Sequence, residues 1–241
     1  MNISATVNQA IDRIPPGKIF GYEVFTEYQT KPEAVIRAVG RRVADAQLTR
    51  LSKGRFYIPK KGVLGEIGVS DGALLRDLLF RKGKRCGYIT GAALYNRLGL
   101  TSQMPKTLEI AADRAPQTKD FGTIRIKYVP RQTPITEANV PLLEILDVLR
   151  DAKKVPDAST EDVIKMMRNQ IVELETDKIQ KMQNLAIGFY NAATRAVLGM
   201  ILDRNTQEVL PALRKSINPT TRFDVGLDKG QWPSASVWNI R

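Results

Sequence analysis

The chain has 241 residues, of which 43% are hydrophobic, enough for one large domain or two of ordinary size. It carries 37 Lys and Arg against 25 Asp and Glu, a formal net charge of +12, which favours a polyanionic partner such as double-stranded DNA. The absence of histidine excludes imidazole-dependent triads and His-ligated zinc sites, and one cysteine, Cys86, excludes an internal disulfide. Because such cysteine usage is typical of a reducing compartment, we expect a cytoplasmic protein.

The first quarter of the chain has the pattern of a winged helix-turn-helix. The expected elements are a helix at 4–14 ended by Pro15-Pro16-Gly17, a short strand at 19–20, a helix at about 21–28, a helix from Pro32 to about Ala46, and a hairpin with strands at 48–51 and 56–58. This order predicts a DNA-binding domain over residues 1–62. A small α/β domain that uses the same topology for protein contact is the alternative.

The helix that begins at Pro32 carries the strongest functional signal. Residues on its apolar stripe, at about 100° per residue, are Val35, Ile36, Val39, Val43 and Ala46. Arg37 and Arg41 share the opposite face, and the small side chains near them belong to Ala34, Gly40 and Ala44. We therefore expect this helix to lie in a DNA major groove, which is wide enough for it.

Basic residues concentrate in this part of the chain, where residues 1–62 hold eleven Lys and Arg against five Asp and Glu. The expected DNA-binding residues are Lys31, Arg37, Arg41, Arg42, Lys53, Arg55, Lys60 and Lys61. Lys53 and Arg55, at the hairpin tip, are expected to contact phosphates. A second basic cluster, formed by Arg81, Lys82, Lys84 and Arg85, predicts either another phosphate contact or a solvated loop.

Residues 63–241 predict a larger mixed α/β domain with a small sheet and C-terminal helices, so that the whole chain is α+β and mainly helical. Its expected parts are a connection at 63–70, helices at 71–80 and 88–98, strands at 107–112 and 123–129, helices at 141–149, 160–174 and 177–203, an edge strand at 223–227, and a terminus pinned by Trp232 and Trp238. The apolar run from Leu185 to Leu202 contains Asn191, Thr194 and Arg195, so we interpret it as a buried helix and expect no membrane partner.

Motifs for catalysis are missing from the sequence. It has no Walker loop, no Gly-x-Gly-x-x-Gly and no paired Cys-x-x-Cys. Its Asp-x-Lys at Asp151-Ala152-Lys153 falls at a helix end, unlike the strand-borne site of a metal-dependent nuclease. We therefore expect no enzyme, no catalytic residue, no metal site and no cofactor.

Several segments resemble the AbiEi-type antitoxins of bacterial abortive-infection, type IV toxin-antitoxin systems. The resemblance is carried by the predicted winged helix, the segment Tyr88–Pro105 with its Gly-Ala-Ala-Leu and Gly-Leu-Thr-x-Gln-x-Pro motifs, Val197–Leu202, Asn218–Thr221 and the ending Trp238-Asn239-Ile240. It implies an autorepressing DNA-binding regulator whose C-terminal domain opposes a nucleotidyltransferase-type toxin. The alternative is a protein-interaction module that neutralises a partner without specific DNA binding. Neither possibility fixes the oligomeric state.

Overall fold

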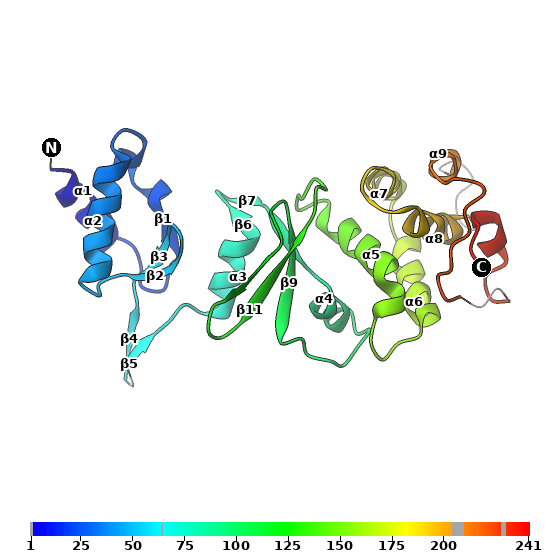
Figure 1. Cartoon of the computed structure of the whole chain (residues 1–241), viewed down its shortest axis with the longest axis horizontal. Coiled ribbons are helices and arrows are strands. Elements are labelled where there is room, and N and C mark those ends of the chain that lie inside the picture. Colours follow the sequence, from blue (N-terminus) through cyan, green and yellow to red (C-terminus); the bar gives the residue numbers. More distant parts are fainter. Residues whose placement is uncertain (1, 64, 204–209, 228–229) are drawn as a thin grey trace. The chain divides into compact units, whose positions relative to one another are not determined.

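The computed structural model describes residues 2–63, 65–203, 210–227 and 230–241. The chain has an α+β fold and divides into two compact units, Met1–Lys82 and Gly83–Arg241, here the N-terminal and C-terminal units (Figure 1). The division falls later than the domain boundary expected after residue 62. An ion pair between Arg55 and Asp77, 2.9 Å apart, explains part of this, because it ties the segment after the predicted boundary to the preceding sheet.

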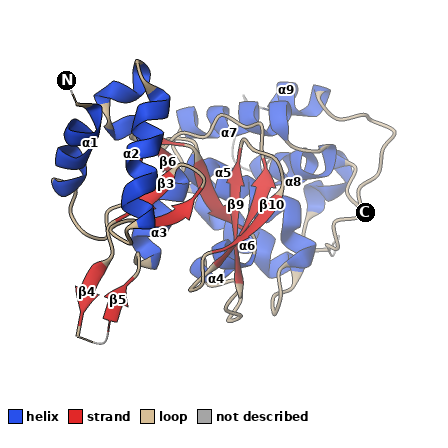
Figure 2. Cartoon of the chain, turned by 60° about the vertical axis from the view of Figure 1, so that its left-hand side comes forward, coloured by secondary structure: helices blue, strands red, loops and turns tan. Residues whose placement is uncertain are grey.

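Helices and short strands alternate in the N-terminal unit. They are α1 (Ile3–Asp12), β1 (Phe20–Gly21), the 3-10 turns η1 (Tyr22–Val24) and η2 (Thr26–Gln29), α2 (Pro32–Ala44), β2 (Thr49–Ser52), β3 (Arg55–Tyr57), β4 (Lys60–Gly62), β5 (Gly65–Ile67), α3 (Asp71–Leu79) and β6 (Phe80–Arg81). Strand β3 lies between β1 and β2 in an antiparallel sheet, and β4 pairs with β5 (Figure 2). The β4–β5 pair replaces the irregular connection expected from residue 63 onward.

The helix expected at about 21–28 is wrong. Two 3-10 turns occupy this segment, and Phe25 between them has an extended backbone with φ −98° and ψ 119°. Its side chain is 2% exposed and packs edge-on against Phe20. Burial of this one aromatic ring therefore outweighs the local helical preference.

Helix α2 forms where its sequence predicts, with Pro32 in the first turn. It buries Val35, Ala38 and Val39 against α1 and the sheet. The expected stripe needs two corrections: Ile36 is 42% exposed, and Ala46 lies beyond the helix end with φ +55°. The buried face is therefore narrower than the sequence pattern indicates.

The C-terminal unit combines a four-stranded sheet with a group of helices. Its elements are β7 (Lys84–Arg85), β8 (Gly87–Thr90), α4 (Ala92–Arg97), β9 (Thr107–Ala112), β10 (Gln117–Asp120), β11 (Arg125–Pro130), α5 (Val140–Asp151), the 3-10 turn η3 (Ala152–Lys154), α6 (Thr160–Val172), α7 (Thr176–Phe189), α8 (Ala192–Leu202), α9 (Leu210–Lys215) and the 3-10 turn η4 (Pro233–Trp238). The sheet order is β10-β11-β9-β8, with β9 and β11 parallel. Helix α5 packs against α6, α7 and α8 (Figure 1).

Three expectations for this unit are wrong. The helix expected at 88–98 begins with strand β8, and Gly91, with φ +66°, redirects the chain into α4. The helix expected at 177–203 is broken where Tyr190 is extended and Asn191 caps α8 by accepting the Thr194 amide hydrogen bond at 2.8 Å. The expected edge strand at 223–227 is a single bridge between Phe223 and Ile240.

The C-terminal tryptophans are buried as expected. Trp232 is 3% exposed and Trp238 is 2% exposed, and Trp238 packs directly on Gly199 of α8. The apolar run from Leu185 to Leu202 is also buried, across α7 and α8. In the part of the chain that the structure describes, no helix combines the length and apolar character needed to cross a membrane.

A buried carboxylate, Asp147 of α5, links these elements. It is 0% exposed. Its partners are the hydroxyl groups of Tyr88 (3.0 Å), Thr90 (2.6 Å) and Tyr190 (2.9 Å) and the guanidinium groups of Arg150 (2.6 Å) and Arg131 (3.6 Å). Burial, together with the Asp147 charge, raises the pKa of Tyr88 and of Tyr190, so both phenols remain neutral donors. The carboxylate thereby joins β8, α5 and the break between α7 and α8.

Candidate nucleic-acid interface

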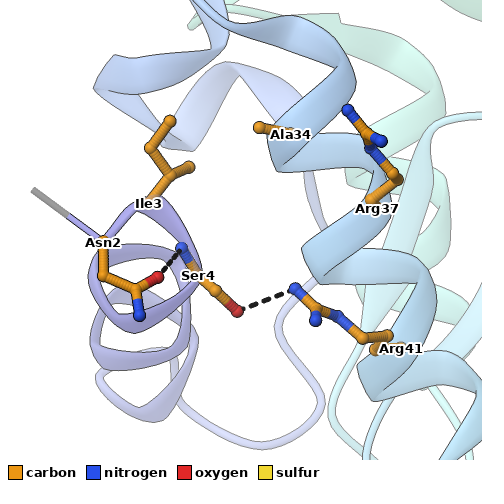
Figure 3. Close-up of a pocket in the computed structure, with 6 residues that line it drawn as sticks. All are labelled: Asn2, Ile3, Ser4, Ala34, Arg37 and Arg41. Atoms are coloured by element: carbon orange, nitrogen blue, oxygen red, sulfur yellow. Dashed lines mark hydrogen bonds between the residues drawn. The ribbon is translucent and has the colours of Figure 1, made fainter.

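Arg37 and Arg41 are both exposed on α2, as expected, and the Arg41 guanidinium is directed toward Ser4 of α1 (Figure 3). The Arg37 side chain is 76% exposed, and its guanidinium lies 3.8 Å from the Glu33 carboxylate. Arg41 donates a hydrogen bond to Ser4 Oγ at 2.9 Å. Neither guanidinium is enclosed by carboxylates, because Ser4 is neutral and the contact with Glu33 is long and exposed.

A shallow hollow of about 590 Å³ lies between the start of α1 and this face of α2. Its lining residues are Asn2, Ile3, Ser4, Ala34, Arg37 and Arg41 (Figure 3). Asn2 caps α1 by accepting the Ser4 amide hydrogen bond at 3.1 Å, and the Ser4 hydroxyl accepts the hydrogen bond from Arg41. Neither Asn2 nor Ser4 is among the residues predicted from the sequence, although Asn before an amphipathic run is a cap signal.

Arg42 contacts the later turns of α1 and holds this helix against α2. Its guanidinium donates to Asn8 at 2.9 Å and Gln47 at 2.6 Å, and it pairs with Asp12 at 3.0 Å. The Arg42 side chain is 20% exposed. These contacts make Arg42 a residue that positions α2.

The β2–β3 hairpin presents Lys53 to solvent beside Gly54, whose φ of +72° allows the tight turn. Arg55 instead forms ion pairs with Glu23 and with Asp77 and is 23% exposed. Burial raises the pKa of Asp77, with the Arg55 charge acting in the opposite direction. Arg55 is therefore neutralised by two carboxylates, and of the two basic residues at the hairpin tip only Lys53 faces solvent.

The other expected contacts fall in separate places. Lys31 is exposed at the N-cap of α2, and Lys60 and Lys61 are exposed on β4. In the second basic cluster, Arg81 and Lys82 belong to the N-terminal unit, and Lys84 and Arg85 belong to the C-terminal unit. Arg85 pairs with Glu137 at 3.5 Å and donates to the Gly87 carbonyl at 2.8 Å.

The N-terminal unit is thus an α+β module with a basic, outward helix face. The chain belongs to a family of unknown function, DUF6088, whose model matches residues 6–184. No curated protein sequence matches it. Among solved structures it is similar to the crystal structure of the RV2827C protein from Mycobacterium tuberculosis, with a TM-score of 0.45 and 17% identity over 95% of this chain and 87% of that chain.

Proposed function

We propose that residues 1–62 are a winged helix-turn-helix that binds double-stranded DNA. Helix α2 lies in the major groove, and the β2–β3 hairpin follows the adjacent phosphates. The observation that carries this proposal is the exposure of Arg37 and Arg41 on a helix face with small neighbours. The α2 backbone can approach the bases closely because Ala34 and Gly40 place little bulk around the two guanidiniums.

The basic residues then have different tasks. Arg37 and Arg41 contact base edges or the phosphates beside them, because arginine can donate two parallel hydrogen bonds to guanine. Lys53 contacts phosphate, and exposed Lys31, Lys60 and Lys61 add to the attraction without reading sequence. Arg42 and Arg55 act indirectly, since their contacts with Asp12 and Asp77 fix α2 and the hairpin.

The resemblance to AbiEi-type antitoxins extends this proposal to the whole chain. The protein binds DNA upstream of its own gene, represses it, and opposes a nucleotidyltransferase-type toxin encoded next to it. In this account it is a regulator rather than an enzyme and needs no cofactor. The toxin is opposed through the C-terminal unit, directly or indirectly.

A binding titration tests the DNA-binding proposal. The full chain is titrated with duplex DNA from upstream of its gene and with a shuffled duplex of equal composition, at several salt concentrations. The double variant Arg37→Ala/Arg41→Ala should lose about 1–3 kcal/mol per arginine on the upstream duplex and most of its preference. Lys53→Ala should weaken both duplexes equally and reduce the salt slope by about 1.

Arg13→Ala is the matched control, because Arg13 is exposed at the opposite end of α1 from Ser4. Equal binding of the upstream duplex by the wild type and the double arginine variant would refute the proposal. Co-expression with the adjacent reading frame separates it from the alternative, a neutralisation module without specific DNA binding. If the wild type rescues growth but does not repress a reporter driven by the upstream DNA, the alternative is favoured.

A further inference from the structure

A second cavity, of about 400 Å³, lies in the C-terminal unit, away from any residue discussed for DNA binding. It is lined by the segment after β11, by Arg150 of α5, and by the turn between α7 and α8. Its volume is within the range of small-molecule sites, about 300–1,000 Å³. Such a cavity therefore has room for a small ligand.

The cavity is suited to a negatively charged group. Arg131 and Arg150 both line it, and among its lining residues, all of which the structure describes, none is acidic. Their side chains are 19% and 21% exposed, and both guanidiniums contact Asp147. Arg150 also pairs with Asp151 at 2.5 Å, whereas Nε of Arg131 has no hydrogen-bond partner among the described residues, so Arg131 is the main donor to an anion. A larger neighbouring cavity shares both arginines but is also lined by Glu109 and Asp151, so it is less selective for anions.

Two further features support an anion in the smaller cavity. Asn191, which lines it, is the N-cap of α8, an 11-residue helix whose amino end favours negative charge. Thr133 also lines it, is 5% exposed, and its Oγ1 has no hydrogen-bond partner among the described residues. Buried hydroxyl groups are normally hydrogen-bonded, so this one indicates a missing partner.

An aromatic ring stands beside these groups. Phe189, the last residue of α7, lines the same cavity and is 47% exposed, although most other aromatic side chains of this unit are buried. An exposed ring next to two guanidiniums matches a ligand that combines a planar base with a phosphate. We propose that this cavity binds a nucleoside monophosphate, with its phosphate between Arg131, Arg150 and the start of α8 and its base on Phe189.

The test is calorimetric titration of the full chain with 5′-AMP, adenosine and inorganic phosphate. We expect one 5′-AMP per chain with a Kd below about 1 mM. Adenosine and inorganic phosphate should each bind at least about tenfold more weakly, because each makes half of the contacts. The variant Arg37→Ala/Arg41→Ala should bind 5′-AMP as the wild type does. The 5′-AMP proposal and the DNA-binding proposal can therefore be refuted independently of each other.

Two variants locate the site. Arg131→Gln should weaken 5′-AMP binding at least about tenfold, and Phe189→Ala at least about fivefold. Arg125→Gln, at the other end of β11, and Met104→Ala, which shortens a side chain that is 79% exposed, are the matched controls and should bind as the wild type does. Because Phe189 is half exposed, its variant should fold normally even if Arg131→Gln is destabilised.

The proposal is overturned if 5′-AMP does not bind at millimolar concentration. It is also overturned if Phe189→Ala binds 5′-AMP as tightly as the wild type, or if inorganic phosphate binds as tightly as 5′-AMP. Weakened binding in both site variants with unchanged controls would support it.

Discussion

Replacing Asp147 by asparagine should destabilise the C-terminal unit strongly. The substitution keeps the shape of the side chain but removes the charge that Arg150 contacts at 2.6 Å and Arg131 at 3.6 Å. The new amide can still bond to the hydroxyls of Tyr88 and Thr90, because hydroxyl groups can accept as well as donate. The decrease in the free energy of unfolding therefore comes mainly from the lost charge interactions with Arg150 and Arg131.

The structure gives the size of this effect. Hydrogen bonds to charged groups contribute about 1.5–3 kcal/mol, and removing one partner of a buried ion pair costs about 3–5 kcal/mol. Arg150 keeps a second carboxylate, Asp151, at 2.5 Å, so we expect a loss of about 3 kcal/mol rather than the upper limit. For a unit of this size the thermal midpoint should fall by about 6–12 °C.

Thermal unfolding followed by tryptophan fluorescence measures this loss, because both tryptophans, Trp232 and Trp238, are buried in the C-terminal unit. Asp120→Asn is the control, since Asp120 pairs with Arg125 at the surface and should leave the midpoint unchanged. A midpoint for Asp147→Asn within about 2 °C of the wild type would show that the two arginines do not depend on this carboxylate.

Three other variants test separate parts of the structure. Arg42→Ala should destabilise the N-terminal unit by about 1–3 kcal/mol, seen as faster hydrogen exchange in α1 and α2, and should weaken DNA binding without changing sequence preference. Gly199→Ala should cost about 1–3 kcal/mol in urea unfolding, because its Cβ would overlap the Trp238 ring, whereas Gly188→Ala, with open space at its Cβ, should not destabilise. Burial alone would raise the pKa of Asp151, but its contacts with Arg150 and Lys154 outweigh burial and lower that pKa. The ionised Asp151 therefore contributes to the free energy of unfolding above about pH 4, and this contribution is lost as the pH falls. Asp151→Asn should accordingly flatten the decline of stability, measured by urea unfolding, below that pH.

The sequence predicts elements well where one periodic signal dominates. Helix α2 runs from Pro32 to Ala44, close to the expected range of Pro32 to about Ala46. The prediction is accurate because the proline start and the apolar residues at helical spacing indicate the same helix. Strand β9 was expected at residues 107–112 and occupies them. Ser159 caps α6 as its position before an apolar run predicts, accepting the Asp162 amide hydrogen bond at 3.1 Å.

Tertiary packing decides the elements that the sequence predicts wrongly. The segment Tyr88–Leu98 was expected to be one helix, yet its first residues join β9 as a strand that directs Tyr88 and Thr90 toward Asp147. The break at Tyr190 has a related cause, since its phenol also donates to Asp147. Local propensity cannot anticipate a carboxylate that lies more than forty residues away in the chain.

Only part of the candidate nucleic-acid interface can be predicted from the sequence, because part of it depends on tertiary packing. The outward face of Arg37 and Arg41 follows from helical periodicity. The ion pairs of Arg42 with Asp12 and of Arg55 with Asp77 cannot be predicted from periodicity, because each joins two separate elements. Helical spacing thus identifies the exposed face of α2, but only tertiary packing shows that Arg42 and Arg55 are engaged by carboxylates.

Methylation interference with the upstream duplex tests most directly whether α2 reads the major groove. Methyl groups on guanine N7 lie in the major groove, whereas those on adenine N3 lie in the minor groove. We predict that N7 methylation at a few guanines abolishes binding of the wild-type chain and that Arg37→Ala/Arg41→Ala loses this sensitivity. Binding that tolerates N7 methylation throughout the duplex, or is blocked only by N3 methylation, would contradict the account.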